Sequence, residues 1–375
     1  MGTYLEAARD LRTTIESGAG DDGHVPDKTM EALAAAQLQG VLTPRDVGGS
    51  ELSVTDAIDV FAELSYADGS AGWCLMASAS VTAFFGAWAA DDFARECFAD
   101  GVPLAAGQFA PNGTATRDGD GWRLNGNYQF GSGIVHARWV GAGVLTQPDD
   151  GANPDFLLAL FPAEHATRKG NWDVLGLRAT ASEDYEVRDV SVPAGATFNF
   201  FAPVRYRGGP VYDLGVLGVT AVGHSGFALG VTRRALDELA AVATGAKHRM
   251  GAPSPLRDSE RFLHELGNLE GRYRAARAWV YEAFGDAQRA AEDGAPTAHH
   301  VNLVRQATVH VTQEGADIAR SAYLLAGTTA LRDGPLQRCF RDLHAGTQHF
   351  FASPAAAQDV ARDVLAASEE REASR

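Results

Sequence analysis

Apolar residues recur every three or four positions over about the first 100 residues, a spacing that buries one face of a helix. Residues 55–64 show this spacing clearly, because their apolar side chains share one helical face. The same spacing returns at about Leu214 and persists almost to the end, most regularly in residues 260–293 and 298–325. The pattern predicts a helical module at each end of the chain.

The middle of the chain, residues 102–204, changes to an alternation of apolar and polar residues with turn-forming residues between the runs. Residues 122–128 alternate around an Asn125-Gly126 pair, a dipeptide typical of two-residue hairpin turns. Further strands are predicted at residues 156–161 and 185–193. This region is therefore predicted to form a small β-domain, most simply a barrel.

These patterns predict an α+β protein with three parts. They are an N-terminal helical domain (residues 1–101), a β-barrel domain (102–205) and a C-terminal four-helix bundle (206–375). With 375 residues, 45% of them hydrophobic, the chain is large enough for more than one packed core.

Composition narrows the classes of partner. The formal net charge of −16 and the lack of a basic stripe argue against nucleic acid or an anionic membrane as a partner. The three cysteines are far apart and form no Cys-x-x-Cys pair, so we expect a reducing, cytoplasmic location. No apolar run approaches the roughly 18 residues that a membrane span requires.

A metal site is not expected from the sequence. His299, His300 and His310 fall on one predicted helix, but no set of carboxylates accompanies them at a metal-ligand spacing. Solvated or core histidines account for all three.

A histidine near the C-terminus is the strongest candidate for chemistry. His349 lies seven residues after an Arg341-Asp342 pair and is followed by Phe350 and Phe351. A neutral imidazole among apolar neighbours can accept or share a proton near physiological pH. The alternative is that His349 only caps or packs a helix.

Residues 121–139 carry the motif Trp-x-Leu-x-Gly-x-Tyr-x-Phe-x-Ser-Gly-x-x-x-Ala, which resembles that of two-component flavin-dependent monooxygenases with the acyl-CoA dehydrogenase fold. The oxygenase components of p-hydroxyphenylacetate hydroxylases belong to this group. Residues 67–73 and 171–184 resemble two further motifs of the family or its superfamily. The order of helices, barrel and bundle is also that of the superfamily, so the resemblance covers nearly the whole chain.

The resemblance implies an activity and its partners. A separate NAD(P)H:flavin reductase would supply reduced FAD or FMN, and O₂ would form a C4a-hydroperoxyflavin that hydroxylates or N-oxygenates a small aromatic substrate. The family also implies a homotetramer with flavin sites between subunits. No dinucleotide-binding glycine motif follows a predicted strand, which agrees with electrons that come from another protein.

The resemblance also implies roles for individual residues. Ser132 would lie near flavin N5, and Gly133 would let the backbone approach the ring. Gln108 and Phe109 occupy the position of contacts to the edge of the isoalloxazine. His349 would act as a general base on the substrate or hold the proton of the peroxide.

Three more residues are candidates for cofactor binding by position alone. Arg249 lies where family members offer an arginine to the pyrophosphate of a neighbouring subunit. Gly327 and Thr328 lie in a turn similar to the glycine-containing turn before the last family helix. The alternatives are a solvated arginine and an ordinary turn between helices.

The substrate pocket is predicted to contain Trp73, Phe84 and Phe350. Trp73 follows Asp68, a predicted N-cap, in a segment that opens a buried helix in the monooxygenases. All three aromatic residues could equally be ordinary core residues.

Two other functions remain possible from the sequence. An acyl-CoA dehydrogenase needs a carboxylate base, and Phe350 lies at or beside the place of the family's catalytic glutamate. Glu265 or Glu270 could still supply a base from another helix. A catalytically silent flavin-binding scaffold is the third possibility.

Overall fold

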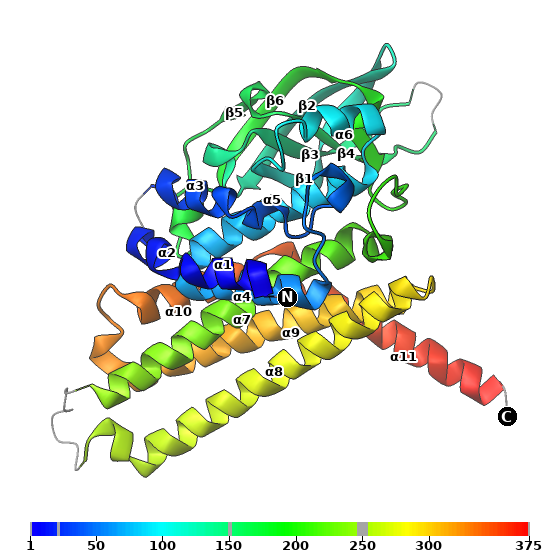
Figure 1. The fold of residues 1–375 in the computed structure, drawn as a ribbon. Coiled ribbons are helices and arrows are strands. Elements are labelled where there is room, and N and C mark those ends of the chain that lie inside the picture. The colour runs from blue at the N-terminus through cyan, green and yellow to red at the C-terminus, as the bar shows by residue number, and fades with distance from the viewer. Residues whose placement is uncertain (1, 21–22, 149–151, 246–253, 374–375) are drawn as a thin grey trace.

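The computed structural model describes residues 2–20, 23–148, 152–245 and 254–373. Helices precede and follow a central sheet (Figure 1). The helices before the sheet are α1 (Gly2–Asp10), α2 (Arg12–Gly18), α3 (Asp27–Ala35), α4 (Val54–Ala67), α5 (Gly69–Trp88) and α6 (Asp91–Cys97). The strands are β1 (Ala105–Asp118), β2 (Gly121–Gly131), β3 (Trp139–Thr146), β4 (Phe156–Pro162), β5 (Ala166–Arg168), β6 (Glu183–Val192) and β7 (Thr197–Asn199). The helices after the sheet are α7 (Gly215–Thr244), α8 (Glu260–Glu292), α9 (Ala298–Ala326), α10 (Pro335–Gly346) and α11 (Ala355–Ala373).

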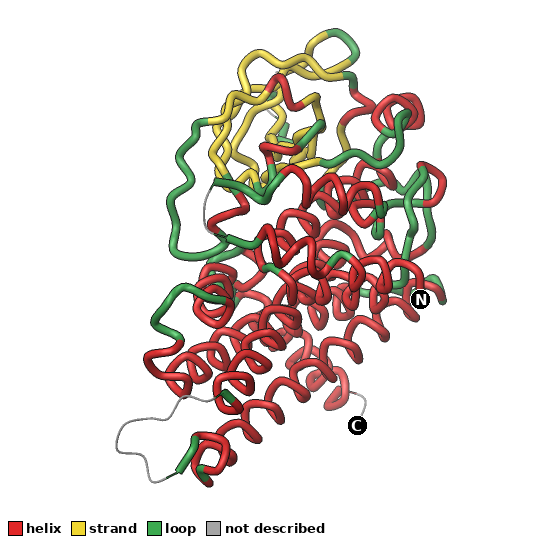
Figure 2. The backbone as a smooth tube through the Cα atoms, turned by 60° about the vertical axis from the view of Figure 1, so that its left-hand side comes forward, coloured by secondary structure: helices red, strands yellow, loops and turns green. Residues whose placement is uncertain are grey.

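The strands form one mixed sheet in the order β5-β6-β2-β1-β3-β4-β7, and the sheet is strongly curved (Figure 2). Only β1 and β3 pair in parallel, and the other pairs are antiparallel. The hairpin predicted at Asn125-Gly126 is wrong, because the turn lies between β1 and β2, at Gly119 with φ of 59°. Asn125 and Gly126 instead lie inside β2 at a bulge against β6, where Asn125 Oδ1 accepts from the Asp189 amide at 3.0 Å.

Two long apolar helices, α5 and α7, form the centre of the helical part. The sequence led us to expect no segment of this kind, but two, Gly69–Trp88 and Pro210–Thr244, are long and apolar enough to cross a membrane; 94% and 83% of their apolar windows are buried inside the fold. We therefore describe both as core helices, which are apolar on all sides when fully buried. Asp68 is the N-cap of α5, as predicted, and its side chain accepts from the Ala71 amide at 2.8 Å.

The helices after the sheet pack as a bundle in which α7 and α9 each contact the other three of the helices α7, α8, α9 and α10. The two long helices predicted from the sequence are present as α8 and α9, with ends within one residue of the prediction. The helix α4 packs along α7, so helices from both ends of the chain share one layer. By contrast, α11 packs against α9 and extends away from the body (Figure 1).

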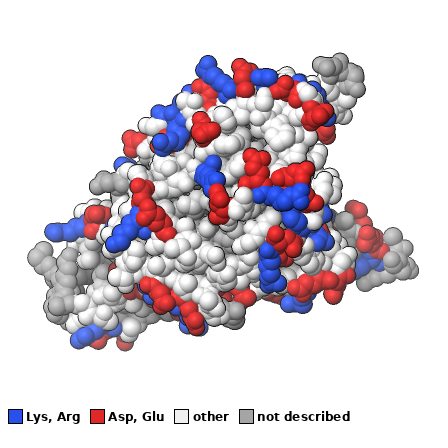
Figure 3. All heavy atoms as spheres, turned by 45° about the horizontal axis from the view of Figure 1, so that its top comes forward, with Lys and Arg blue, Asp and Glu red and all other residues white. Residues whose placement is uncertain are grey.

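Charged side chains of both signs are interspersed on the face that Figure 3 shows, without a continuous basic stripe there. The lack of a basic stripe on this face agrees with the formal net charge of −16. It gives no support to a nucleic-acid partner on that face.

A buried carboxylate joins the bundle to the segment before β6. Asp342, in α10, is 6% exposed and accepts from the Leu177 amide through Oδ1 at 2.6 Å. At Gly176 the chain passes so close to α10 that an added Cβ would lie 2.2 Å from the Arg341 carbonyl oxygen. A glycine is therefore required at this crossing.

Replacement of Asp342 with alanine should lower the free energy of unfolding by about 1–3 kcal/mol, because the buried Leu177 amide loses its acceptor. Asp342→Asn keeps an acceptor oxygen and should lose less. Urea denaturation measures both changes. The control is Asp333→Ala, at a side chain that is 79% exposed, which should change stability by less than about 0.5 kcal/mol. Equal losses for Asp342→Ala and Asp333→Ala would contradict this account.

Candidate active site

Aromatic rings from three segments meet beside α10. Trp73 of α5 makes edge contacts with Phe227 of α7 (ring centroids 4.8 Å apart) and with His349 (5.4 Å). His224 of α7 lies 4.2 Å from His349 and is stacked against Phe351 at 5.1 Å. These five rings, Trp73, His224, Phe227, His349 and Phe351, are called the aromatic cluster below.

The close packing of the cluster depends on the end of α10. An added Cβ at Gly346 would lie 2.8 Å from the Phe227 ring and 3.7 Å from Trp73. The chain then turns so that His349 precedes a short 3₁₀ turn, Phe350–Ala352. The glycine therefore admits the two rings, and the turn brings His349 and Phe351 onto them.

Ser132, just after β2, is attached to the cluster by a buried hydrogen bond. Trp73 Nε1 donates to Ser132 Oγ at 3.0 Å. Ser132 Oγ lies 2.8 Å from Ser182 Oγ, which lies 2.7 Å from Thr180 Oγ1. Thr180 Oγ1 donates to the Leu177 carbonyl at 2.7 Å. The predicted pair, Ser132 and His349, is thus brought together through Trp73.

The donor and acceptor in each of these hydrogen bonds can be assigned by counting protons, since each hydroxyl has one proton to donate and two lone pairs that can accept. Thr180 uses its proton on the Leu177 carbonyl, so Ser182 must donate to Thr180. Ser132 must then donate to Ser182 if all the contacts are hydrogen bonds. Ser132 accepts from Trp73 as well, so it keeps one free lone pair and no free proton.

The tautomer of His349 follows in the same way. The Phe351 amide donates to His349 Nδ1 at 3.2 Å, so the proton of the neutral ring lies on Nε2. Burial lowers the pKa of His349 to about 4, although its side chain keeps some solvent exposure, so the ring is neutral at physiological pH. In this state His349 offers an Nε2–H donor, which favours a proton-holding role over that of a general base.

His224 was missed by sequence reasoning. It is 7% exposed, and its pKa is lowered well below the usual value, first by burial and then by the nearby His349. Its ring nitrogens have no hydrogen-bond partner among the described residues. The available signal was one histidine in an otherwise apolar helix, and a core histidine is the usual explanation for such a residue.

Other predicted site residues lie elsewhere. Phe84 is fully buried between Trp88 and Phe109, at ring distances of 5.3 and 5.6 Å, so it is a core residue outside the aromatic cluster. Phe350, which we predicted in the substrate pocket, is 64% exposed. Its neighbour Phe351 lies in the aromatic cluster instead. The sequence could not distinguish two adjacent phenylalanines, because the turn after α10 decides which one faces inward.

The predicted contacts on β1 and after α9 do not join the cluster directly. The Gln108 amide donates to the Tyr185 hydroxyl at 2.9 Å, and its side chain bonds to Asn112. Gly327 and Thr328 form a turn before α10, whereas His349 follows its other end, and twelve helical residues span about 18 Å. Arg249 lies outside the described residues.

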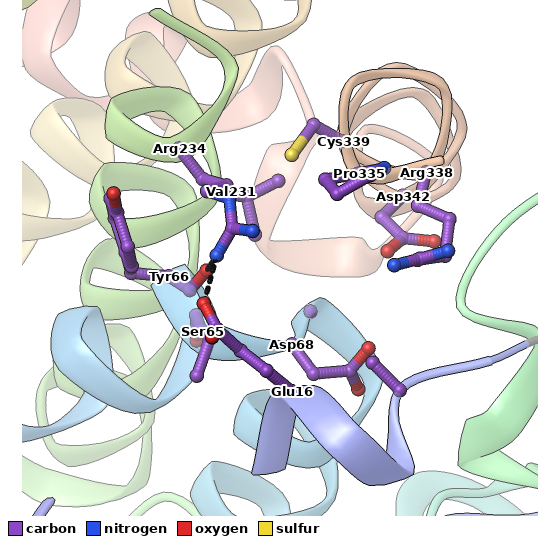
Figure 4. Close-up of a pocket in the computed structure, with 13 residues that line it drawn as sticks. Glu16, Ser65, Tyr66, Asp68, Val231, Arg234, Pro335, Arg338, Cys339 and Asp342 are labelled. Atoms are coloured by element: carbon purple, nitrogen blue, oxygen red, sulfur yellow. Dashed lines mark hydrogen bonds and ion pairs between the residues drawn. The ribbon is translucent and has the colours of Figure 1, made fainter. Parts of the chain in front are cut away.

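A separate polar cleft lies near the N-terminal part of α10 (Figure 4). Arg234 crosses it and pairs with Glu16 and Glu238. Asp342 lines this cleft too, but no ring of the aromatic cluster does. The cleft is therefore distinct from the candidate site, and its main cation is already paired.

The carboxylates proposed as alternative bases are not at the site. Glu270 is held by Arg233 at 2.6 Å and by Arg274 at 2.8 Å. Both Glu265 and Glu270 lie on α8, which packs against α9, α7 and α4 rather than against α5 or α10.

Comparisons with known proteins show the family of the chain. Residues 7–95 match the family described as "Acyl-CoA dehydrogenase, N-terminal domain", and residues 222–354 match "Acyl-CoA dehydrogenase, C-terminal domain". An indole-3-acetate monooxygenase of Pseudomonas putida is 32% identical over 88% of this chain and 84% of its own. The chain belongs to the flavin-dependent monooxygenases with the acyl-CoA dehydrogenase fold. It is thus an enzyme of the oxygenase-component type.

Solved structures share the fold of this monooxygenase. XiaF from Streptomyces, in complex with FADH₂ and glycerol, has a TM-score of 0.88 at 22% identity and covers 97% of this chain and 95% of its own. TdsC from Paenibacillus, in complex with FMN and indole, has a TM-score of 0.82 at 21% identity, with 96% of each chain covered.

The lowered pKa of His349 predicts a pH-dependent loss of stability. Between about pH 6.5 and pH 4, His349 is protonated in the unfolded chain but stays neutral in the folded protein. The free energy of unfolding therefore falls as the pH falls through this window. Above it, His349 contributes no pH dependence. Urea denaturation between pH 7 and pH 5 should show a smaller decline in His349→Asn than in the wild type. Carboxylates titrate in both proteins, so equal declines would mean that His349 is not held neutral.

Proposed function

We propose that this monooxygenase uses reduced FAD or FMN, delivered by a separate NAD(P)H:flavin reductase, and O₂ to hydroxylate a small aromatic substrate. The observation that carries the proposal is the pair of oriented polar groups at the aromatic cluster, the Ser132 lone pair and the His349 Nε2–H. The flavin, when bound, would supply the activation of oxygen. The protein residues would bind, orient and exclude water.

Ser132 fits a reduced flavin better than an oxidised one. Reduced flavin carries a proton on N5, whereas oxidised flavin has only a lone pair there. Since Ser132 donates to Ser182 and accepts from Trp73, it can accept from an N5–H but cannot donate without breaking its chain. Gly133, with φ of 71°, follows directly and lacks the Cβ that would hinder close approach of a flat ring.

His349 would hold a proton near the reacting oxygen. Its Nε2–H forms no hydrogen bond among the described residues, so this donor is available to a ligand. The Trp73 and Phe351 rings both pack against the two histidine rings and give them an apolar surrounding. A hydrogen bond in such a water-poor place is stronger than in bulk solvent.

The substrate class is proposed from the cluster and the relatives together. The indole-3-acetate monooxygenases are relatives by sequence, and TdsC was solved with indole. An indole or a phenol matches the aromatic rings of the cluster, because edge and offset contacts between rings are favourable. An amino sugar, the alternative for N-oxygenation, has no aromatic face to offer.

We also propose that the working enzyme is a homotetramer in which a second subunit contributes Gly327, Thr328 and Arg249 to the flavin. The turn at Gly327 is one helix length from His349 in the same chain. Large apolar side chains are exposed on α9 and α11, where Leu324 is 61% and Leu365 64% exposed, as expected for a surface that another subunit covers.

Turnover with chemically reduced flavin, O₂ and indole or a phenol should yield oxygenated product. His349→Ala should lower product formation by about 100-fold, as does loss of one preorganised donor, while hydrogen peroxide release rises. Reduction of a bound flavin by acyl-CoA would instead indicate a dehydrogenase. Flavin binding without any oxygenated product across indole, phenol and amino-sugar substrates would indicate a silent scaffold.

Ser182→Ala tests the direction of the hydroxyl chain. The Ser132 proton then becomes free to donate to the N5 lone pair of oxidised flavin. The preference for reduced over oxidised flavin should fall by roughly 2- to 10-fold, the range of one net hydrogen bond. Anaerobic and aerobic titrations measure the two affinities.

The matched control is Ser80→Ala, which removes a buried hydroxyl that bonds to the Met76 carbonyl at 2.9 Å and lies outside the chain. It should leave the preference unchanged. An unchanged preference in Ser182→Ala would mean that Ser132 does not meet N5.

A further inference from the structure

Two histidines and one aspartate converge away from the aromatic cluster. His24 Nε2 and His136 Nδ1 each lie 3.4 Å from the same oxygen, Oδ1 of Asp27. The two imidazole rings are edge to face, with centroids 5.1 Å apart. One ligand atom from each residue lies within 4.8 Å of the other two.

We propose that His24, Asp27 and His136 form a binding site for a zinc ion. In a tetrahedral zinc site with bonds of about 2.0–2.1 Å, two ligand atoms are roughly 3.3 Å apart, and the centres of two ligating imidazoles are roughly 5 Å apart. The separations in this protein match both values before any ion is added. Three protein ligands leave the fourth position to water.

The ligand chemistry selects the class of metal. Two of the three atoms are imidazole nitrogens, which suit zinc and other first-row transition metals such as copper, iron and nickel. Magnesium and calcium prefer sites made of oxygen ligands. The site therefore discriminates against the two most abundant divalent cations.

The burial of the ligands suits an ion that enters from solvent. The His136 side chain is only 7% exposed and lies on the protein side of the site, while the side chains of His24 and Asp27 are 44% and 75% exposed. An ion would replace two long contacts of 3.4 Å with ligand bonds. The site needs little rearrangement, because its most buried ligand, His136, already lies 3.4 Å from Asp27.

An ion here would fasten the N-terminal helices to the wall of the active site. Asp27 is the first residue of α3, and His136 ends a 3₁₀ turn, Ile134–His136, that begins directly after Gly133. Between them, the Val25 amide donates to the Ala179 carbonyl at 2.8 Å. The proposed site thus lies behind the segments that carry Ser132 and Ser182, and its existence does not depend on the reaction.

The test is a titration of the full-length, chelator-treated protein with Co²⁺ and then Zn²⁺. We expect one equivalent of Co²⁺ to bind with visible d–d absorption, and Zn²⁺ to displace it. His24→Ala and Asp27→Asn should each weaken binding by more than about 10-fold, since each removes a ligand. Both side chains are exposed, so both variants should fold, which circular dichroism checks without metal.

The matched control is His299→Ala. His299 Nδ1 pairs with Asp363 Oδ2 at 2.9 Å, so this variant also removes an exposed histidine from a carboxylate. Asp363 pairs with one histidine, whereas Asp27 lies beside two. It should bind Co²⁺ as the wild type does. Zinc should also raise the melting temperature of the wild type and of His299→Ala, but not of His24→Ala.

Two results would overturn the proposal. One is the absence of saturable Co²⁺ binding to the wild type. The other is binding that His24→Ala and Asp27→Asn leave unchanged, which would place the metal elsewhere. Neither result bears on flavin binding or oxygenation, which are measured separately.

Discussion

A chain of buried hydrogen bonds holds the candidate site together. It runs from Asp342 in the bundle to the Leu177 amide, and from the Leu177 carbonyl through Thr180, Ser182 and Ser132 to Trp73. Leu177 has φ of 56°, a conformation that costs a non-glycine residue about 1–2 kcal/mol. The hydrogen bonds to the amide and to the carbonyl of Leu177 offset this strain. These hydrogen bonds therefore tie the bundle to the sheet and to α5. They also fix the Ser132 hydroxyl as a donor to Ser182 and an acceptor from Trp73.

The same fold supports a different chemistry when a carboxylate is replaced by a neutral ring. A carboxylate in the last helical stretch can take a proton from a substrate carbon, whereas His349 is held neutral and carries its proton on Nε2. Its neighbour His224 is neutral for the same reason, since burial disfavours a charged imidazole. We therefore expect His349 to hold a proton rather than to remove one, as the proposed oxygenation requires.

Much of the fold could be predicted because its signals are local. The long helices α8 and α9 follow from apolar spacing, and the start of α5 follows from Asp68 as an N-cap. The local signal was misleading at Asn125-Gly126, where alternation continues through the dipeptide and a bulge accommodates it within β2. Ser132, Trp73 and His349 could be proposed as site residues because each lies in or near a recognisable motif.

The sequence by itself determined the helical periods, the family motifs and the presence of Ser132 and His349, because these depend on neighbours along the chain. Only the tertiary structure decided that Phe351 rather than Phe350 joins the cluster, that His224 lies against His349, and which hydroxyl donates to which. The convergence of His24 and Asp27 on His136 also belongs to this second group. These facts depend on contacts between segments 50 or more residues apart, or on the way one turn closes, and spacing along the chain records neither.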